Sequence, residues 1–285
     1  MPKGTRSIIY TPESRLRHPL KLLADMWRDL LASRELAWRL LVRDISALYR
    51  QSILGIVWAF LPPIVTAVGM VMASNAKVIS IGATDIPYPA YVMFSMALWQ
   101  TFVEALSGPV IGVTSAKQML AKINFPREAL ILSTVGQVFF NFGIKLILIV
   151  SLFLWYRIPI TWSIVVAPVA LIHLVMLGVA IGMLIAPMGA LYQDFAKGLT
   201  LATGFWLFLT PVIYPVPKNE GVFGMLVNLN PVTPLLVTTR ELSTQGMVSD
   251  PLGFWVTSAI AFGLLLFAWL VYRLAMPFVV ERMSA

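Results

Sequence analysis

Long apolar runs alternate with short polar connections along most of this sequence. Six windows are close to 20 residues long or longer, the length that a helix needs to cross roughly 30 Å of hydrocarbon. Only Glu104 and Lys145 place a charge inside any of them. The alternation typical of an outer-membrane strand is absent, so we expect an all-α membrane protein with six transmembrane helices. The windows are residues 53–74, 88–107, 129–155, 162–187, 199–215 and 252–272.

The segment before the first window carries helical signals of its own. Pro19 can open one helix, and Ser33 followed by Glu35 resembles the start of a second. Over residues 34–50, apolar and polar positions recur every three or four residues on opposite faces. The apolar face has Ala37, Leu41, Ile45 and Leu48, and the polar face has Arg39, Arg43, Ser46 and Arg50. This pattern predicts a helix lying in the membrane plane or packed on a soluble partner.

The connection 108–128 predicts a short helix. Ser115 and Gln118 have the spacing of a capping box, and the helix must end before Pro126 because the residue that precedes a proline is steered away from helical geometry. With Lys117 and Lys122 on it, such a helix suits docking to a soluble protein, or it is a plain connector.

The connection 216–250 contains two apolar stretches, 222–229 and 234–242, each too short to cross a membrane. Pro231 and Pro234 separate them. The pattern indicates either a re-entrant pair of short helices sheltered by protein or an ordinary outer loop.

Basic residues are divided unequally between the two sides of the membrane that six crossings define. Sixteen of the 21 Lys and Arg fall on the side of the amino terminus and four on the other, with Lys145 inside a window. Cytoplasmic loops carry this excess, so both termini are expected in the cytoplasm. No signal peptide is expected, because the first window follows a long charged segment.

The composition excludes several classes of protein. The chain is 59% hydrophobic and 12% charged, whereas soluble domains are about one quarter charged. The net charge of +8 does not indicate nucleic-acid binding, because little of this chain is a water-facing surface. There is no cysteine, and with only His18 and His173 a histidine-built metal site is not expected.

No catalytic motif is present. The sequence lacks a Walker phosphate-binding loop, a zincin histidine pair and a Gly-x-Ser-x-Gly elbow. Glu104 is the only acid in any window, and Asp85 and Asp250 are isolated. We therefore do not expect an enzyme. Glu104 and His173 are expected to be paired or to face an interface rather than to form a proton relay.

Two helical faces inside the windows are polar. One lies in the third window and comprises Thr134, Gln137, Asn141 and Lys145. It indicates either a channel wall or contacts between helices, with Lys145 reaching the headgroups. The other lies in the fifth window and comprises Thr200, Thr203 and Thr210, near Phe205, Trp206 and Phe208. It suits either sugar stacking or ordinary packing.

Five short motifs follow one another in a characteristic order. They are Arg43-Asp44-Ile45 with Tyr49 to Gly55 and Trp58, then Asn124 to Glu128, Tyr192-Gln193-Asp194, Leu209 to Pro215, and Asn228 to Pro231. With the six windows and the basic amphipathic start, they resemble the membrane subunit of polysaccharide-exporting ABC transporters, which move lipid-linked O-antigen, capsule or teichoic acid. Gln193 departs from that family, which commonly has arginine at this position.

The resemblance implies an export permease, most simply for O-antigen, in the bacterial inner membrane. It implies a homodimer working with two copies of a separate ATPase subunit. This chain would bind no cofactor itself, since ATP and Mg²⁺ would be held by the partner. The implied parts are a cytoplasmic segment with an interface helix (1–52), a transmembrane domain (53–275) and a tail (276–285), with a coupling helix at 112–127 and an outer gate at 216–247.

Three groups of residues are the candidate sites under this resemblance. The phosphorylated lipid headgroup of the substrate would meet Arg39, Arg43 and Arg50. The ATPase would contact Lys117, Gln118, Lys122, Phe125 and Arg127. The channel would be lined by Gln137, Asn141, Thr203, Phe205, Trp206, Thr210 and Tyr214. The alternative functions are an ABC permease for a drug or another lipid, a membrane-embedded glycan-processing enzyme, and a scaffold.

Overall fold

The chain folds as a bundle of helices, and no β-strand occurs among the residues described by the computed structural model, which are 19–50, 55, 57–77, 82–123, 125–217 and 221–284. The long helices are α1 (Pro19–Arg50), α2 (Val57–Asn75), α3 (Tyr88–Ser115), α5 (Glu128–Tyr156), α6 (Ala167–Leu191), α7 (Asp194–Phe208) and α10 (Pro251–Ser284). The short ones are α4 (Lys117–Lys122), the 3-10 turn Trp162–Val165, α8 (Val222–Leu229) and α9 (Val232–Thr244).

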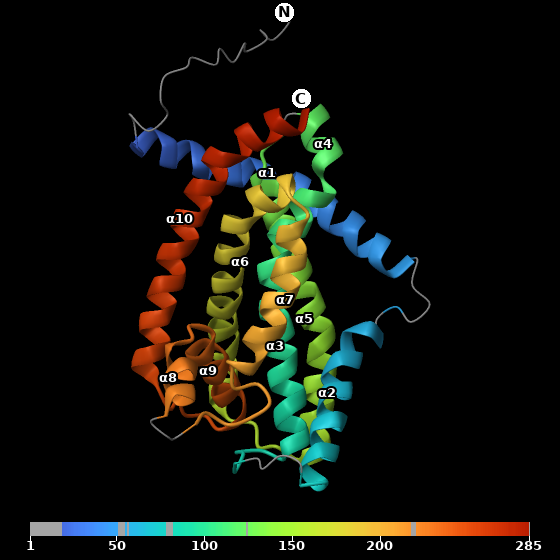
Figure 1. Ribbon diagram of the computed structural model, residues 1–285, viewed down its shortest axis with the longest axis vertical. Helices are drawn as coiled ribbons and strands as arrows, with labels where there is room; N and C mark the ends of the chain where they lie inside the picture. Colours follow the sequence, from blue (N-terminus) through green and yellow to red (C-terminus); the bar gives the residue numbers. More distant parts are fainter. Residues whose placement is uncertain are drawn as a thin grey trace, which may run out of the picture.

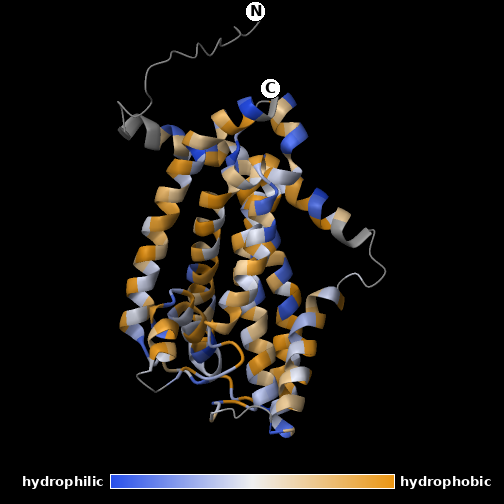
Figure 2. Cartoon of the chain, viewed as in Figure 1, coloured by the Kyte–Doolittle hydropathy of each residue, from blue (hydrophilic) through white to orange (hydrophobic). Residues whose placement is uncertain are grey.

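Helices α2, α3, α5, α6, α7 and α10 stand upright between two distinct ends of the molecule (Figure 1). At one end α1 lies across the bundle, with α4 and the carboxyl end of α10 beside it, and at the other end lie α8 and α9. We call these the α4 end and the α9 end. Apolar residues predominate along the upright helices, and α1 and α4 carry strongly hydrophilic positions (Figure 2).

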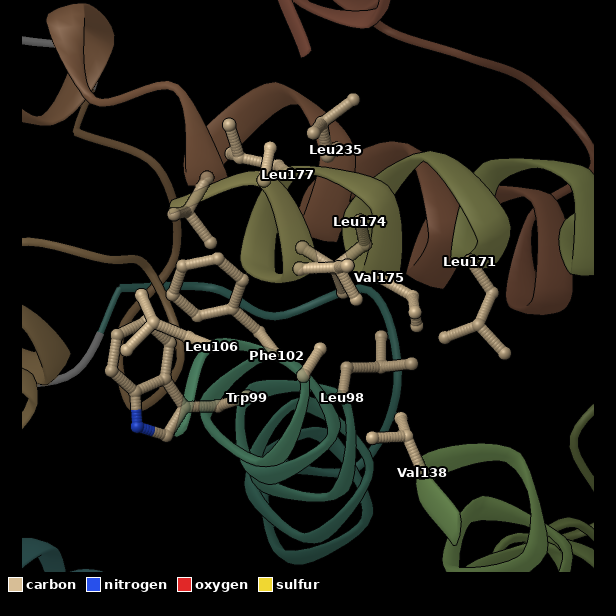
Figure 3. Packing of buried hydrophobic residues seen from close by; sticks show 14 of the residues in the cluster. Leu98, Trp99, Phe102, Leu106, Val138, Leu171, Leu174, Val175, Leu177 and Leu235 are labelled. Carbon is tan, nitrogen blue, oxygen red and sulfur yellow. The ribbon is translucent and has the colours of Figure 1, made fainter. Parts of the chain in front are cut away.

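The centre of the bundle is the pair α3 and α6. Leu98, Phe102 and Leu106 of α3 pack against Leu174 and Leu177 of α6 (Figure 3), and all five side chains are buried. Interiors of membrane proteins depend on such close packing, because lipid offers no hydrophobic drive between helices.

Glycines allow α6 to lie close to α3. A Cβ at Gly182 would overlap the carbonyl oxygen of Leu106, and one at Gly178 would lie 2.8 Å from Ala105 Cβ. Gly189 repeats the contact near the α4 end, where a Cβ would lie 2.6 Å from Val110 Cγ1. The spacing of these glycines at four and seven residues puts them on one face of α6, which is the small-residue packing that membrane helices use.

The amino-terminal segment forms one helix, so the predicted second start at Ser33 is wrong. Ser33 is buried in the middle of α1 and its hydroxyl donates to the carbonyl of Leu30 at 2.8 Å, which satisfies it inside a continuous helix. The bundle-facing side includes Ala37, and Leu41 lies against Gly136 of α5.

The apolar stripe assigned to the acyl boundary is therefore partly a packing face. A different set of α1 side chains is exposed and apolar: Trp27, Leu31, Trp38 and Val42. Their spacing of four, seven and four residues places them on one side of the helix, away from the bundle. Tryptophan is typical of membrane–water interfaces, so this second face is the one that suits lipid.

The connection after α3 also differs from the prediction. Helix α3 continues to Ser115, and the Ser115 hydroxyl donates to Gly112 instead of capping the next helix. Helix α4 begins at Lys117 with no side-chain cap and ends at Lys122, before Pro126 as expected. The capping-box interpretation was wrong because α3 extends further than its apolar window.

Among the described residues, four helices are long and apolar enough to cross a membrane: α2, α5, α6 and α10. The pair α8 and α9, bent by 77° at their junction, would make a fifth if it counts as one span. The six-span count remains a prediction, since α7 has only 15 residues and α3 is less apolar. Helix α3 is surrounded by protein, and this lets it carry polar groups such as Glu104.

Candidate functional site

The predicted coupling residues lie together at the α4 end. Lys117, Gln118 and Lys122 line an open pocket whose other walls come from the ends of α6 and α10. Phe125 is half-buried, and Arg127 precedes α5, where its carbonyl accepts a hydrogen bond from the Tyr272 hydroxyl at 3.4 Å.

Arg273 of α10 joins three helices near the same end. Its guanidinium binds Asp29 of α1 at 2.5 Å and Glu128 of α5 at 3.1 Å. Glu128 and Arg273 are largely buried, with side chains 8% and 12% exposed. Because Glu128 opens the helix that follows α4, this ion-pair cluster ties α1 and α10 to the segment carrying the predicted coupling residues.

Two of the predicted headgroup arginines, Arg39 and Arg43, lie on the exposed side of α1. Arg39 pairs with Glu35 at 2.7 Å, and Arg43 with Asp44 at 2.8 Å. These pairs are solvent-exposed and therefore weak, so they leave the guanidinium groups available to a phosphate. The side chain of Arg50 lies outside the described residues.

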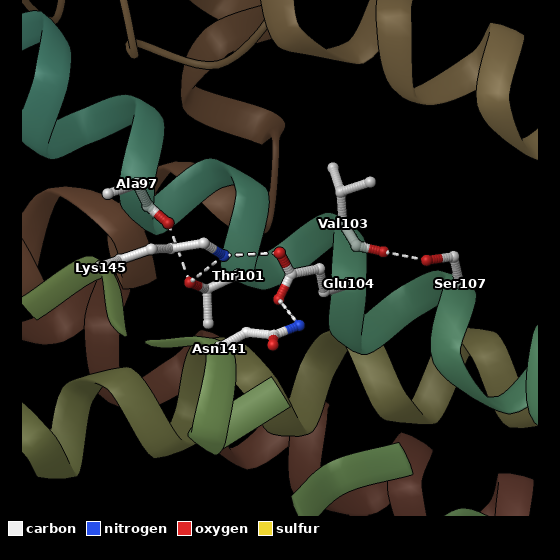
Figure 4. Close-up of polar contacts among 7 residues, drawn as sticks. All are labelled: Ala97, Thr101, Val103, Glu104, Ser107, Asn141 and Lys145. Carbon is white, nitrogen blue, oxygen red and sulfur yellow. Dashed lines mark hydrogen bonds and ion pairs between the residues drawn. The ribbon is translucent and has the colours of Figure 1, made fainter. Parts of the chain in front are cut away.

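The polar face of α5 is a buried contact with α3 (Figure 4). Lys145 Nζ lies 2.6 Å from Glu104 Oε1, and Asn141 Nδ2 donates to Glu104 Oε2 at 3.3 Å. Lys145 is 1% exposed, so the expectation that it reaches the headgroups is wrong, whereas Glu104 is paired as expected. A buried lysine in hydrocarbon needs such a partner.

The other members of this face differ in exposure. Thr134 is buried and donates to the carbonyl of Ile131 in its own helix at 2.9 Å. Gln137 is half-buried. With Asn141 bonded to Glu104, the structure connects α3 and α5 through one of the two predicted channel residues on this helix.

Trp206 of α7 packs inward. Its ring meets Trp99 and Phe102 of α3 edge-on at centroid distances of 6.4 and 5.4 Å. Thr203 is buried and donates to carbonyls of its own helix. Phe205 is 67% exposed, so of these channel candidates it is the one that presents an open aromatic surface.

Asn230 is the hub between α7 and the α8–α9 junction. Its oxygen accepts from Trp206 Nε1 at 2.9 Å and from the Val232 amide at 3.1 Å. Its nitrogen donates to the Leu209 carbonyl at 3.0 Å and to the Thr210 hydroxyl at 2.9 Å. One amide thus uses both its acceptor and its donors to hold the bend.

The segment after α7 is held from α3 and α9. The Tyr91 hydroxyl donates to the Tyr214 carbonyl at 2.9 Å, and the Tyr214 hydroxyl donates to the Phe208 carbonyl at 2.8 Å. Arg240 of α9 is 4% exposed, donates to Ser95 at 2.9 Å and lies 4.1 Å from the centre of the Tyr91 ring. No carboxylate pairs with Arg240 among the described residues.

The sequence patterns do not predict three of these clusters. In the sequence, Asn230 is only part of a motif and Arg240 only one of the outer basic residues. The available signal for both was position: each is a strongly polar residue within or beside a short apolar stretch, where burial requires partners. Glu128 and Arg273 lie far apart in sequence, and nothing in either local pattern predicts their contact.

Replacing Asn230 by alanine is expected to lower the free energy of unfolding by about 2 kcal/mol, because it leaves the buried Trp206 indole and Thr210 hydroxyl with fewer partners. Thermal unfolding of the detergent-solubilised protein measures the change. Asn228→Ala, at an exposed position two residues earlier, is the matched control and should unfold like the wild type. Equal midpoints for the two variants would contradict the hub role.

Apolar helices long enough to cross a membrane, arranged between two structurally distinct ends, define a multi-pass membrane protein. The sequence profile of the ABC-2 type transporter family matches residues 35–242, and this chain belongs to that family. It is therefore a membrane transport subunit, and a permease of an ABC system works with an ATPase partner.

Curated relatives match most of the length of the chain. The O-antigen export system permease protein RfbA of Myxococcus xanthus is 25% identical over 241 residues, covering 84% of this chain and 91% of the relative. Two proteins of the same name from Klebsiella pneumoniae are each 22% identical, covering 82% of this chain and 91% of each relative.

Proposed function

We propose that this chain is the permease subunit of an ABC transporter that exports a lipid-linked O-antigen across the bacterial inner membrane. The observation that carries the proposal is the match to O-antigen export permeases along nearly their whole length. ATP and Mg²⁺ are bound and used by the separate ATPase subunit, and this chain contributes the membrane path.

The proposed topology has six spans: α2, α3, α5, α6, α7 and α10. Helix α3 has 28 residues, about 42 Å at 1.5 Å each, so it is long enough despite its polar groups. Helix α7 reaches only about 22 Å, and the segment 209–217 completes its crossing. The α4 end faces the cytoplasm, which agrees with sixteen basic residues on that side. The bent α8–α9 pair then forms the outer gate.

Two helices whose apolar side chains remain exposed in a single copy of the chain support a homodimer. In α2, apolar side chains such as Trp58, Val65 and Met72 are more than half exposed. In α7, Thr203 is the one buried residue, and Leu201 and Phe205 are exposed. A second copy packed here would place Phe205 beside a conduit between the subunits, where an aromatic ring can stack on sugars.

The proposed mechanism couples the two ends. ATP binding and hydrolysis move the ATPase subunits, these displace α4, and the bundle shifts between states that bind the substrate differently. The lipid headgroup approaches beside α1, where Arg39 and Arg43 can bind its phosphates in bidentate fashion. The glycan then passes along α7 towards α8 and α9.

Complementation tests this function. In a strain that lacks its own O-antigen permease, this chain and its ATPase subunit should restore the O-antigen ladder on surface lipopolysaccharide. An ATPase subunit without its Walker lysine should leave the glycan inside the cell. Surface glycan with the inactive ATPase would contradict the proposal.

A second assay separates the cargo classes. ATP hydrolysis by the purified complex should be stimulated by lipid-linked O-antigen and not by hydrophobic drugs. Stimulation by drugs alone would instead assign the chain to a drug or lipid exporter.

A further inference from the structure

The connection between α7 and α8 begins with a segment that side chains of other elements hold in place. We call residues 209–214 the connecting segment; they form turns rather than a helix and lie at the α9 end of the bundle (Figure 1). Four of their backbone carbonyls accept hydrogen bonds from side chains elsewhere in the chain. The carbonyls and their donors are Leu209 with Asn230, Pro211 with Tyr91 and Arg240, Ile213 with Tyr88, and Tyr214 with Tyr91. The position of this segment therefore depends on α3, α9 and the α8–α9 junction.

Arg240 is the charged donor in this set of contacts. It belongs to α9, is buried, and lies between α3 and the connecting segment. Its Nη1 donates to the Ser95 hydroxyl of α3 at 2.9 Å and to the Pro211 carbonyl at 3.2 Å. Its Cζ lies 4.1 Å from the centre of the Tyr91 ring, which is a cation–π distance. One guanidinium thus joins α9, α3 and the connecting segment.

The partners of Arg240 within the described ranges of the chain are electrically neutral. The neighbouring acid, Glu241, directs its carboxylate oxygens to Ser249, at 2.8 Å from the amide and 2.6 Å from the hydroxyl. Lys145, by contrast, is neutralised by Glu104 at 2.6 Å. Burying a cation without a counter-charge is unfavourable, and hydrogen bonds to neutral acceptors offset less of that penalty than an ion pair does. The Arg240 contact is therefore well defined in geometry but easier to release than the Lys145 pair.

The elements on the two sides of Arg240 differ in how firmly they are packed. Helix α9, which carries it, is buried along almost its whole length. Within one copy, α7 buries Thr203 alone and α8 buries Gly224 and Val227. Segments with few buried residues are the ones that move most readily. The connecting segment lies between these two lightly packed helices, so it can move while α9 and Arg240 stay in place.

We infer that Arg240 is the residue that holds the outer gate closed. In this structure its guanidinium binds the connecting segment to α3, and opening of the gate carries the Pro211 carbonyl away from it. Water that enters the open gate then solvates the guanidinium, which offsets the lost hydrogen bonds. The inference rests on the proposed function and adds to it a positioning residue, which acts through the connecting segment and needs no contact with the glycan.

A single cysteine can report this movement, because the sequence contains none. Val212 follows Pro211 in the connecting segment and is fully buried, so the thiol of a Val212→Cys parent should be hidden while Arg240 holds the segment. The parent permease is assembled with its ATPase subunit in nanodiscs, and the rate of labelling by a negatively charged maleimide is measured without ATP. Adding Arg240→Met should raise this rate by about tenfold or more, since the hydrogen bonds of a charged donor are lost.

Transport should release the same contact in the parent. ATP with lipid-linked O-antigen should raise the labelling rate of the parent several-fold, and an ATPase subunit without its Walker lysine should abolish this rise. With Arg240→Met the rate should already be high and should respond little to ATP. A role of Arg240 in stability alone would leave the response to ATP the same in both proteins.

Two further variants isolate the contact. Arg157→Met removes a cation from an exposed position at the carboxyl end of α5, and it should leave the labelling rate unchanged. Tyr91→Phe keeps the ring beside the guanidinium but removes the hydroxyl bonds to Pro211 and Tyr214, so it should raise the rate by a smaller factor than Arg240→Met. Thermal unfolding identifies any variant with a general loss of fold, and Tyr91→Phe repeats the test should Arg240→Met fold poorly.

Three outcomes overturn the inference. Equal labelling of Arg240→Met and the parent without ATP would show that Arg240 does not hold the segment. A parent rate that stays constant while the complex hydrolyses ATP with its cargo would show that the contact is not released. An equal increase in Arg157→Met would show that loss of any cation at this end has the same effect. Lack of stimulation of the parent complex by O-antigen would instead contradict the proposed function, and the comparison without ATP would still test the contact.

Discussion

Replacing Gly182 with alanine should disrupt the packing of α6 on α3 at the centre of the bundle. The added methyl group would meet the backbone carbonyl of Leu106 and lie 3.0 Å from the ring of Pro109, neither of which can rotate away. The helices α3 and α6 must then separate and lose contacts along both. Overpacking against backbone costs about 3 kcal/mol. We expect a large fall in the unfolding midpoint and in the yield of folded protein.

Gly263→Ala of α10 is the control for this substitution. Nothing lies within 4 Å of a Cβ built at Gly263, and alanine is favoured over glycine in a helix by about 1 kcal/mol. Thermal unfolding of both variants in the same detergent compares them directly. A Gly182→Ala protein as stable as Gly263→Ala would show that α6 does not approach α3 as closely as described.

Removing the Lys145 cation alone should be nearly as damaging. Lys145→Met keeps the length of the side chain but leaves Glu104 with a charge at membrane depth and only Asn141 bonded to it. Breaking a buried pair in this way costs about 3 kcal/mol. Chemical unfolding in mixed micelles, or loss of the folded fraction on heating, measures the destabilisation.

The double variant Glu104→Gln with Lys145→Met distinguishes a structural pair from a general need for polarity. It removes both charges while an amide remains for Asn141, so it should recover most of the lost stability. If the double variant is as unstable as Lys145→Met, the charge on Glu104 is not the cause of the damage. Full stability with lost glycan export would show that the pair also serves transport.

The helices themselves were largely predictable, because apolar windows and proline positions are local signals. Their ends were less so. Helix α3 continues eight residues beyond its window, and in this extension Val110 and Val113 are buried against protein. Ser33 resembles a helix start in the sequence because residue type alone does not distinguish a serine that bonds within its own helix from a serine that caps one.

The candidate sites are formed by contacts between different helices, which the periodicity within one helix does not predict. The face with Asn141 and Lys145 was correctly recognised as polar, but only its neighbour α3 reveals that Glu104 neutralises it. Similarly, the basic residues near α4 were visible in the sequence, whereas their convergence with Arg282 requires the packing of α10. Periodicity predicts which side of a helix is polar, and the three-dimensional packing determines which side chains that face contacts.

Helix α3 has a mechanical consequence that follows from its two ends. One residue, Ala116, separates it from α4, and at the far end Tyr88 and Tyr91 donate to the carbonyls of Ile213 and Tyr214. Helix α3 is about 42 Å long, and it packs closely on the glycines of α6. Since α3 joins the two ends in this way, we expect a displacement of α4 to be felt in the segment before α8.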